Sequence, residues 1–226
     1  MIYLDHAATT PTAQEVLEAM LPYFSARYSN PSSVYRSAGE TRMQIESARR
    51  QIAAFLNADP ACISFTSGGT ESDNWALRAA ALVHSDRGRH IVSTHIEHPA
   101  VGNTLRYLES HGFEVSYANV DREGRTDLED LERKMRPDTV LVSVIHANNE
   151  LGTIEPIEEI GRITSARHVL FHTDAVQSFG KIPIDPVKCH VDLLSASAHK
   201  LYGPKGTGLL YHGPGIPLQK LLFGGS

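Results

Sequence analysis

The sequence lacks the features that mark secreted, membrane-spanning or nucleic-acid-binding proteins. Only two of its 226 residues are cysteine, too few for a disulfide framework, which favours a reducing, cytoplasmic compartment. No apolar stretch is long enough to span a membrane, and the N-terminus has no signal-peptide pattern. The net charge of −5 and the lack of a basic run argue against a nucleic-acid surface. We therefore expect a cytoplasmic protein with no nucleic-acid or membrane partner.

Several common site motifs are also missing. The glycine fingerprint of dinucleotide-binding proteins appears nowhere, and the glycine-rich stretches 66–72 and 203–208 lack the lysine spacing of a Walker phosphate loop. His95 and Glu97 would suit a zinc deaminase, but the paired cysteines of such a site are absent. His95 and His98 join no cysteine pair of a zinc finger. We expect no metal site.

Apolar strands alternate with amphipathic helices along most of the chain. Helices are predicted over 12–27, 37–56, 70–83, 99–111, 128–135 and 157–166. Thr12 is the expected cap of the first, and Pro22 is expected to bend it or end it early. Strands are predicted over 63–65, 91–93, 113–117, 140–145, 169–171 and 191–195, with 208–211 as a hairpin partner. This order predicts an α/β fold, a mostly parallel sheet covered by helices on both faces.

In such sheets ligands bind beyond the carboxyl ends of the strands, so the residues that follow each strand matter most. Thr66 to Ser72 leads directly into a helix, and its glycines would let the backbone close around an anion at the helix N-terminus. The alternative is a capped helix start, with Thr70 and Asp73 as a capping box.

A lysine stands among small residues after the strand 191–195. Lys200 could form a Schiff base with an aldehyde, or could be an ordinary solvated lysine. Asp174 follows the strand 169–171 and would either cap a helix or hold a pyridinium nitrogen protonated. An imidazole in the stretch 94–99 could stack on a flat ring or move protons. Together with the anion cradle, these groups indicate a pyridoxal phosphate site.

Five stretches in this order closely resemble the cysteine desulfurases of the class V aminotransferase superfamily, which have the pyridoxal-phosphate fold type I. They are Tyr3 to Pro11, Phe65 to Ser72, Asn148 to Glu150, Asp174 to Gln177 and Ser197 to Lys200, and the resemblance runs essentially from end to end.

The resemblance implies a role for each matching residue. Lys200 would bind pyridoxal phosphate and then act as the acid and base, and His98 would stack on the ring and assist proton transfer. Asp174 would pair with the ring nitrogen. Gln177 and Asn149 would contact the phenolic oxygen or the substrate. The phosphate would be held by small and polar residues, namely Gly69, Thr70, Ser197 and His199.

The resemblance also implies a reaction and its partners. L-cysteine would be converted to L-alanine, and its sulfur would pass as a persulfide on an enzyme cysteine to an iron–sulfur scaffold or another acceptor protein. The family is homodimeric, with active sites at the subunit interface. The expected division is an N-terminal segment and helix over 1–30, a cofactor-binding large domain over 31–226, and an absent C-terminal small domain toward which the first helix packs. Apolar surface on that helix should make the chain associate with itself.

One departure from the family concerns the nucleophile. The persulfide-bearing cysteine and the substrate-binding arginine of the family lie downstream of Ser226. Cys62 is expected to begin a strand as a small core residue. Cys189 is expected to begin the strand that ends at Ser195, roughly 20 Å from Lys200. Two alternatives therefore stay open: a lyase acting on a related amino acid, like selenocysteine lyase or kynureninase, and a catalytically incomplete fragment that binds cofactor or a partner.

Overall fold

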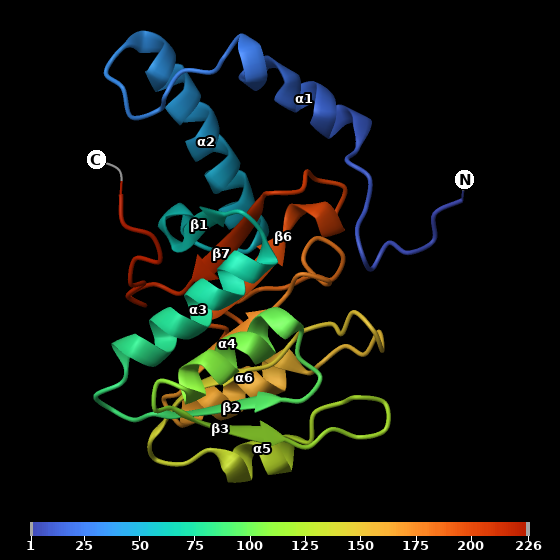
Figure 1. Cartoon of the computed structure of the whole chain (residues 1–226), viewed down its shortest axis with the longest axis vertical. Helices are drawn as coiled ribbons and strands as arrows, with labels where there is room; N and C mark the ends of the chain where they lie inside the picture. Colours follow the sequence, from blue (N-terminus) through green and yellow to red (C-terminus); the bar gives the residue numbers. More distant parts are fainter. Residues whose placement is uncertain (1, 225–226) are drawn as a thin grey trace.

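The computed structural model describes residues 2–224 and has one seven-stranded sheet at its centre (Figure 1). The strand order is β1-β7-β6-β5-β4-β2-β3, and β7 runs antiparallel to both of its neighbours while the other paired strands are parallel. The strands are β1 (Ile63–Thr66), β2 (His90–Thr94), β3 (Glu114–Ala118), β4 (Thr139–Ser143), β5 (Leu170–Asp174), β6 (Leu193–Ser197) and β7 (Gly208–His212). The predicted mostly parallel α/β sheet is confirmed, and β7 is the predicted hairpin partner.

Helices cover both faces of the sheet. The α-helices are α1 (Gln14–Ser25), α2 (Arg36–Phe55), α3 (Gly69–Val83), α4 (Pro99–Glu109), α5 (Leu128–Lys134) and α6 (Ile157–Ala166). Two short 3-10 helices, η1 (Pro60–Cys62) and η2 (Ala198–Lys200), were not predicted. The apolar residues of α3 and α4 pack on one face of the sheet, and those of α5, α6 and the end of α2 pack on the other.

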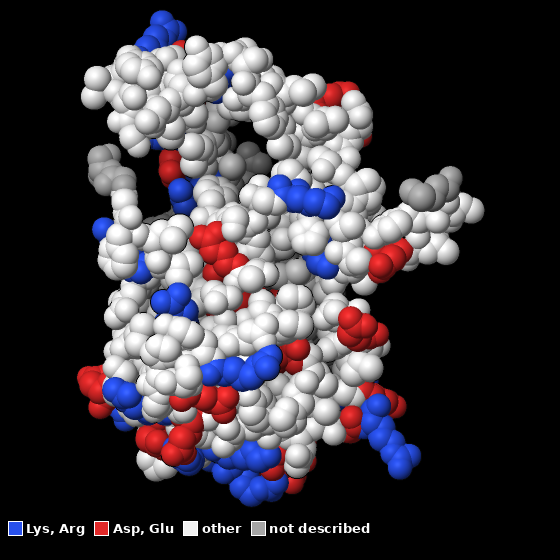
Figure 2. All heavy atoms as spheres, in the orientation of Figure 1, with Lys and Arg blue, Asp and Glu red and all other residues white. Residues whose placement is uncertain are grey.

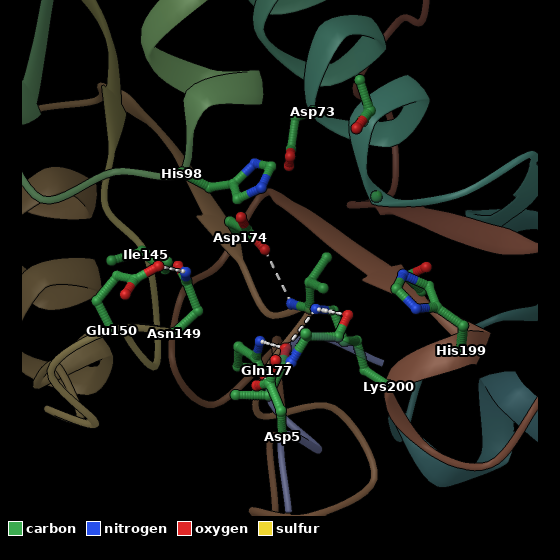
Figure 3. A pocket seen from close by; sticks show the side chains of 16 residues that line it. Asp5, Asp73, His98, Ile145, Asn149, Glu150, Asp174, Gln177, His199 and Lys200 are labelled. Atoms are coloured by element: carbon green, nitrogen blue, oxygen red, sulfur yellow. Dashed lines mark hydrogen bonds between the residues drawn. The ribbon is translucent and has the colours of Figure 1, made fainter. Parts of the chain in front are cut away.

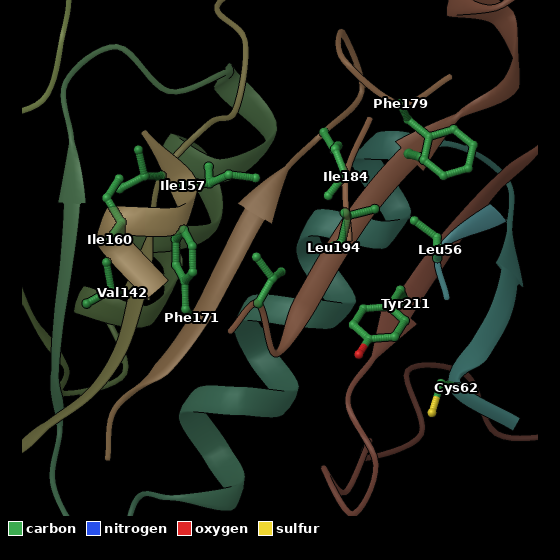
Figure 4. Close-up of a cluster of buried hydrophobic side chains, with 14 of the residues drawn as sticks. Leu56, Cys62, Val142, Ile157, Ile160, Phe171, Phe179, Ile184, Leu194 and Tyr211 are labelled. Carbon is green, nitrogen blue, oxygen red and sulfur yellow. The ribbon is translucent and has the colours of Figure 1, made fainter. Parts of the chain in front are cut away.

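Successive side chains of the central strands point alternately to the two faces of the sheet, so each face has its own apolar cluster. Leu193 of β6 and Leu210 of β7 point toward α3 and α4. Their chain neighbours Leu194 and Tyr211 point toward the opposite cluster, where Phe171 of β5 is also fully buried (Figure 4). Because successive side chains of a strand face opposite sides, a strand buried on both faces needs a nearly continuous apolar run.

Helix α1 and the first half of α2 form an arm that projects from one end of the sheet (Figure 1). No residue of α1 is buried, and the arm is largely free of charged side chains in the view of Figure 2. Large apolar side chains are exposed there, namely Leu17, Leu21, Phe24, Tyr28, Val34, Tyr35 and Met43.

Three local predictions need correction. Pro22 does not end α1, which continues to Ser25 because the carbonyl of Pro22 still accepts from the N–H of Ala26. Thr12 does not cap α1, since its hydroxyl donates to the carbonyl of Gly203 at 3.4 Å. Cys189 lies in a turn before β6 and does not begin a strand.

The remaining boundaries differ by a few residues. Cys62 ends η1 immediately before β1 and is buried, as expected of a core residue. Strand β6 begins two residues later than predicted, which places Ser195 and Ser197 within the strand. Among the described residues, no helix combines the length and apolarity needed to cross a lipid bilayer.

Candidate active site

A cavity of about 470 Å³ lies where the carboxyl ends of β5 and β6 meet the start of α3 (Figure 3). Its volume falls within the range of sites that bind small molecules. All nine residues predicted from the sequence line this cavity: Gly69, Thr70, His98, Asn149, Asp174, Gln177, Ser197, His199 and Lys200. Parallel strands end at one edge of a sheet, and that geometry gathers residues which lie up to 131 positions apart in the chain (200 − 69).

The glycines before α3 leave room on one wall of the cavity. Gly68 is the N-cap and has a φ of 153°, which only glycine adopts readily. A Cβ at Gly69 would come within 2.5 Å of a methyl of Val176. The first-turn N–H groups of a helix have no partner inside the helix and carry partial positive charge, so this wall suits an anion. The capping-box alternative is wrong, because Gly68 caps α3 with no side-chain hydrogen bond.

Lys200 ends η2, and its side chain is half-buried at the cavity. Its Nζ donates to the backbone carbonyl of Ala8 at 2.8 Å and also to that of Ala7. Burial lowers the pKa of the Lys200 amine below its usual range, and the nearby charge of Lys181 acts in the same direction. A lowered pKa leaves more of the amine unprotonated at neutral pH, which is the nucleophilic form.

The N-terminal segment (residues 7–13) runs beside the residues that follow β6. Thr10 bonds the carbonyl of His199 twice, through its N–H at 2.8 Å and its hydroxyl at 2.9 Å. The N–H of Ala13 donates to the carbonyl of Tyr202 at 2.9 Å. The Gln177 amide donates to the carbonyl of Ala7 at 2.7 Å. The segment thus forms part of the cavity wall and holds three of the predicted residues, His199, Gln177 and Lys200, through its backbone.

Two carboxyl groups face the cavity from different elements. Asp174 ends β5, and its Oδ1 accepts from the N–H of Val176 at 2.9 Å. Asp73 lies on α3 and was not predicted as a site residue. Both are buried, with exposed fractions of 2% and 1%. Burial raises the pKa of Asp174 to about 7, and the charge of Asp73 adds to this. Burial likewise raises the pKa of Asp73 to about 7, partly offset by the Ser195 hydroxyl.

His98 is the N-cap of α4 and lines the cavity beside the two carboxyl groups (Figure 3). Its Nδ1 accepts from the N–H of Ala100 at 3.1 Å, which leaves Nε2 free to face the cavity. Donor atoms of Asp73, His98 and Asp174 lie within 4.8 Å of one another, a spacing that a metal ion could also use. The prediction that the chain has no metal site is not tested by this geometry. His95 does not line the cavity and stacks on Tyr117, with ring centroids 4.3 Å apart.

The loop after β4 supplies the remaining wall. Asn149 and Glu150 line the cavity, and the Asn149 amide donates to the Glu150 carboxylate at 2.9 Å. Asn148 stays behind them and shapes the loop, since its Oδ1 accepts from the N–H groups of Glu150 and Leu151. Neither Cys62 nor Cys189 lines the cavity.

Comparison with known proteins agrees with this geometry. The family model for aminotransferase class-V matches residues 2–226. A putative cysteine desulfurase IscS 1 of Bacillus subtilis is 51% identical over 224 residues, covering 99% of this chain and 59% of the relative. The cysteine desulfurase IscS of Dictyoglomus turgidum is 50% identical over 225 residues, covering 57% of its length. The chain thus spans less than two thirds of these curated relatives.

Solved structures give the same result. A NifS-like protein superposes with a TM-score of 0.96 at 44% identity, covering 99% of this chain and 62% of that one. SspA, solved in complex with cysteine, superposes with a TM-score of 0.96 at 42% identity, covering all of this chain and 65% of SspA. From the matched family model and these relatives, we conclude that the chain belongs to the class-V aminotransferase family.

Proposed function

We propose that the chain is the pyridoxal-phosphate-binding part of a cysteine desulfurase. The observation that carries this proposal is the meeting of Lys200 and Asp174 in one cavity whose opposite wall is the glycine start of α3. A lysine, a buried carboxyl group and an anion cradle are the three contacts that pyridoxal phosphate requires.

The residues present fit this cofactor. The space beside Gly69, which a Cβ would fill, suits the phosphate, and Thr70, Ser197 and His199 line the same cavity. Asp174 offers a carboxyl group to the ring nitrogen, and His98 offers a flat ring. When bound, the cofactor supplies an aldehyde and an electron-withdrawing ring, which side chains lack.

Each residue has a physical task in this proposal. Lys200, with its lowered pKa, binds the cofactor through its amine and afterwards accepts and returns a proton at Nζ. Asp174 holds negative charge where the ring carries positive charge. His98, with its Nε2 free to face the cavity, stacks on the ring and assists proton transfer. Gln177 and Asn149 orient the phenolic oxygen or the substrate.

The relatives support the proposed substrate. Relatives named cysteine desulfurases and a relative solved with cysteine support L-cysteine as substrate and L-alanine as product. In that reaction the C–S bond breaks and an enzyme thiolate takes the sulfur as a persulfide. We place that thiol outside this chain, because Cys62 and Cys189 do not line the cavity. This observation also favours the second candidate, a cofactor-binding part that does not turn over alone.

The assembly is also part of the proposal. The exposed apolar side chains of the arm support a homodimer and the packing of α1 against a small domain that completes the protein, with residues 31–226 as the cofactor-binding domain. An iron–sulfur scaffold or another cytoplasmic acceptor protein would receive the sulfur.

Chemical trapping tests the cofactor and the lysine together. After incubation with pyridoxal phosphate and reduction with borohydride, peptide mass mapping should locate the adduct on Lys200. The variant Lys200→Ala should lose the adduct and the absorbance of the bound cofactor completely. The matched control is Lys205→Ala, which removes an exposed lysine five residues away and should retain both. An adduct that persists in Lys200→Ala contradicts the assignment.

A further inference from the structure

Asp73 and Asp174 form a buried acid pair. Asp73 reaches the cavity from α3 and Asp174 from the end of β5, and donor atoms of the two lie within 4.8 Å of each other (Figure 3). Among the described residues, Asp73 Oδ1 has no hydrogen-bond partner although the side chain is almost fully buried. An unpartnered carboxylate at such a position is costly unless it is protonated or meets a ligand.

The groups that face the pair do not neutralise two negative charges. His172 of β5 has its Nε2 3.5 Å from Asp73 Oδ1, and its ring nitrogens bond the hydroxyls of Ser143 and Ser195. Burial lowers the pKa of His172 to about 4, so this ring is neutral at pH 7. His98 accepts from the N–H of Ala100 through Nδ1, so only its Nε2 is left to face the pair.

Other charged groups near the pair include Glu97 and Lys200, and the acids Asp5 and Glu150 line the same cavity. Glu97 is a third acid, and burial raises its pKa to about 8. Lys200 directs its amine to the carbonyls of Ala7 and Ala8. Two like charges in one enclosed site cannot both persist, and one of the two groups then keeps its proton.

The hydrogen bonds distinguish the two members. Asp174 Oδ1 accepts from the N–H of Val176, a contact that favours the ionised carboxylate. Asp73 Oδ1 has no such donor among the described residues. We propose that Asp73 and Asp174 share one proton at neutral pH, carried by Asp73, so that Asp174 alone keeps the negative charge.

This pairing makes Asp73 a positioning residue that acts through Asp174. The pairing itself concerns the cofactor-free chain and needs no assumption about activity. The purpose of the shared proton rests on the proposed function. A single carboxylate charge balances a single protonated ring nitrogen, whereas two carboxylate charges would leave one of them buried without a partner.

Titration of the cofactor-free protein tests the pair directly. Aspartate labelled with ¹³C at the carboxyl carbon should show two coupled signals, identified by their loss in Asp73→Asn and Asp174→Asn. In Asp73→Asn, the Asp174 signal should titrate about one pH unit or more lower, because its like-charged neighbour is gone. By reciprocity, Asp174→Asn should lower the midpoint of Asp73 by a similar amount. Asp130→Asn, on α5 beside the end of β3 and outside the cavity, is the matched control and should move neither signal.

The result that overturns the proposal is an Asp174 midpoint unchanged in Asp73→Asn together with an Asp73 midpoint unchanged in Asp174→Asn. Two reciprocal variants keep the test valid if one of them folds poorly. A purely structural role for Asp73 would change the melting temperature without moving the Asp174 midpoint. The outcome is separable from the proposed function, because the titration uses no cofactor and the borohydride experiment depends on Lys200 alone.

Discussion

The two ends of the central sheet treat buried polar groups in opposite ways. At the amino end, His90 opens β2 and is fully buried, yet its Nδ1 bonds the Thr139 hydroxyl at 2.7 Å and its Nε2 bonds the Ser116 hydroxyl at 2.9 Å. At the carboxyl end, oxygens of Asp73 and Glu97 have no hydrogen-bond partner within residues 2–224. The His90 ring thus has both nitrogens satisfied, whereas one oxygen of Asp73 and one of Glu97 are not.

The acids show the same contrast in their protonation. Asp130, on α5 beside the end of β3 and outside the cavity, accepts from Lys134, from the N–H of Asn119 and from Arg133, which lowers its pKa to about 2. Asp73 has its pKa raised to about 7 by burial. The difference shows that the fold places its well-partnered groups away from the cavity and accepts a loss of stability where a ligand would bind.

Breaking the satisfied cluster should have the largest effect on stability. His90→Leu keeps most of the volume but leaves the hydroxyls of Thr139 and Ser116 buried without their imidazole partner. The free energy of unfolding should fall by about 3 kcal/mol, measured by urea denaturation. Ser116→Ala, which removes one hydrogen bond at the partly buried side of the ring, should cost less. A His90→Leu protein as stable as the parent would show that the cluster is dispensable.

Neutralising a cavity acid should act in the opposite direction. The folded pKa of Asp73, about 7, lies above its unfolded value, so the folded state binds the extra proton and stability falls as the pH rises from about 4 to 7. Asp73→Asn removes this loss and should increase the free energy of unfolding at pH 8 by about 2 kcal/mol. The gain should vanish below pH 4, where both states are protonated. A destabilised variant at pH 8 would contradict this account.

The smallest effect is expected at Asp130 and in acid. Its folded pKa, about 2, lies below the unfolded value, so its contribution is present above about pH 4 and is lost as the pH falls through 2. Asp130→Asn should therefore lose less stability than the parent between pH 4 and pH 2. The measurement is the melting temperature of each protein at each pH. If the two proteins lose the same stability in acid, the hydrogen bonds and ion pairs of Asp130 do not stabilise the folded state.

The cavity was predictable because its residues belong to strand ends. Apolar runs indicated the strands, and parallel order requires their carboxyl ends to meet, so Asp174 and Lys200 had to lie near each other. The roles of Asp174 and Lys200 were inferred from the chemistry of their side chains and from the family resemblance, and they remain predictions.

What the sequence could not reveal has a physical reason in each case. Asp73 was interpreted as a capping residue, because its position in the first turns of α3 does not say which way its side chain faces. Ala7 and Ala8 act through their carbonyl oxygens, and a backbone group leaves no mark in the residue pattern. Cys189 was placed in a strand because the turn over 185–190 precedes β6 without a glycine to mark it.

The contact between the N-terminal segment and the residues after β6 has a consequence for biosynthesis. Thr10 and its partner His199 are 189 positions apart, so a ribosome adding 5 to 20 residues per second makes the second roughly 10 to 40 s after the first. Through that interval the segment has no docking site, and the cavity lacks both Lys200 and one wall. The site therefore cannot form until both segments have been synthesised, and any cofactor capture that requires Lys200 must wait until translation has passed that residue.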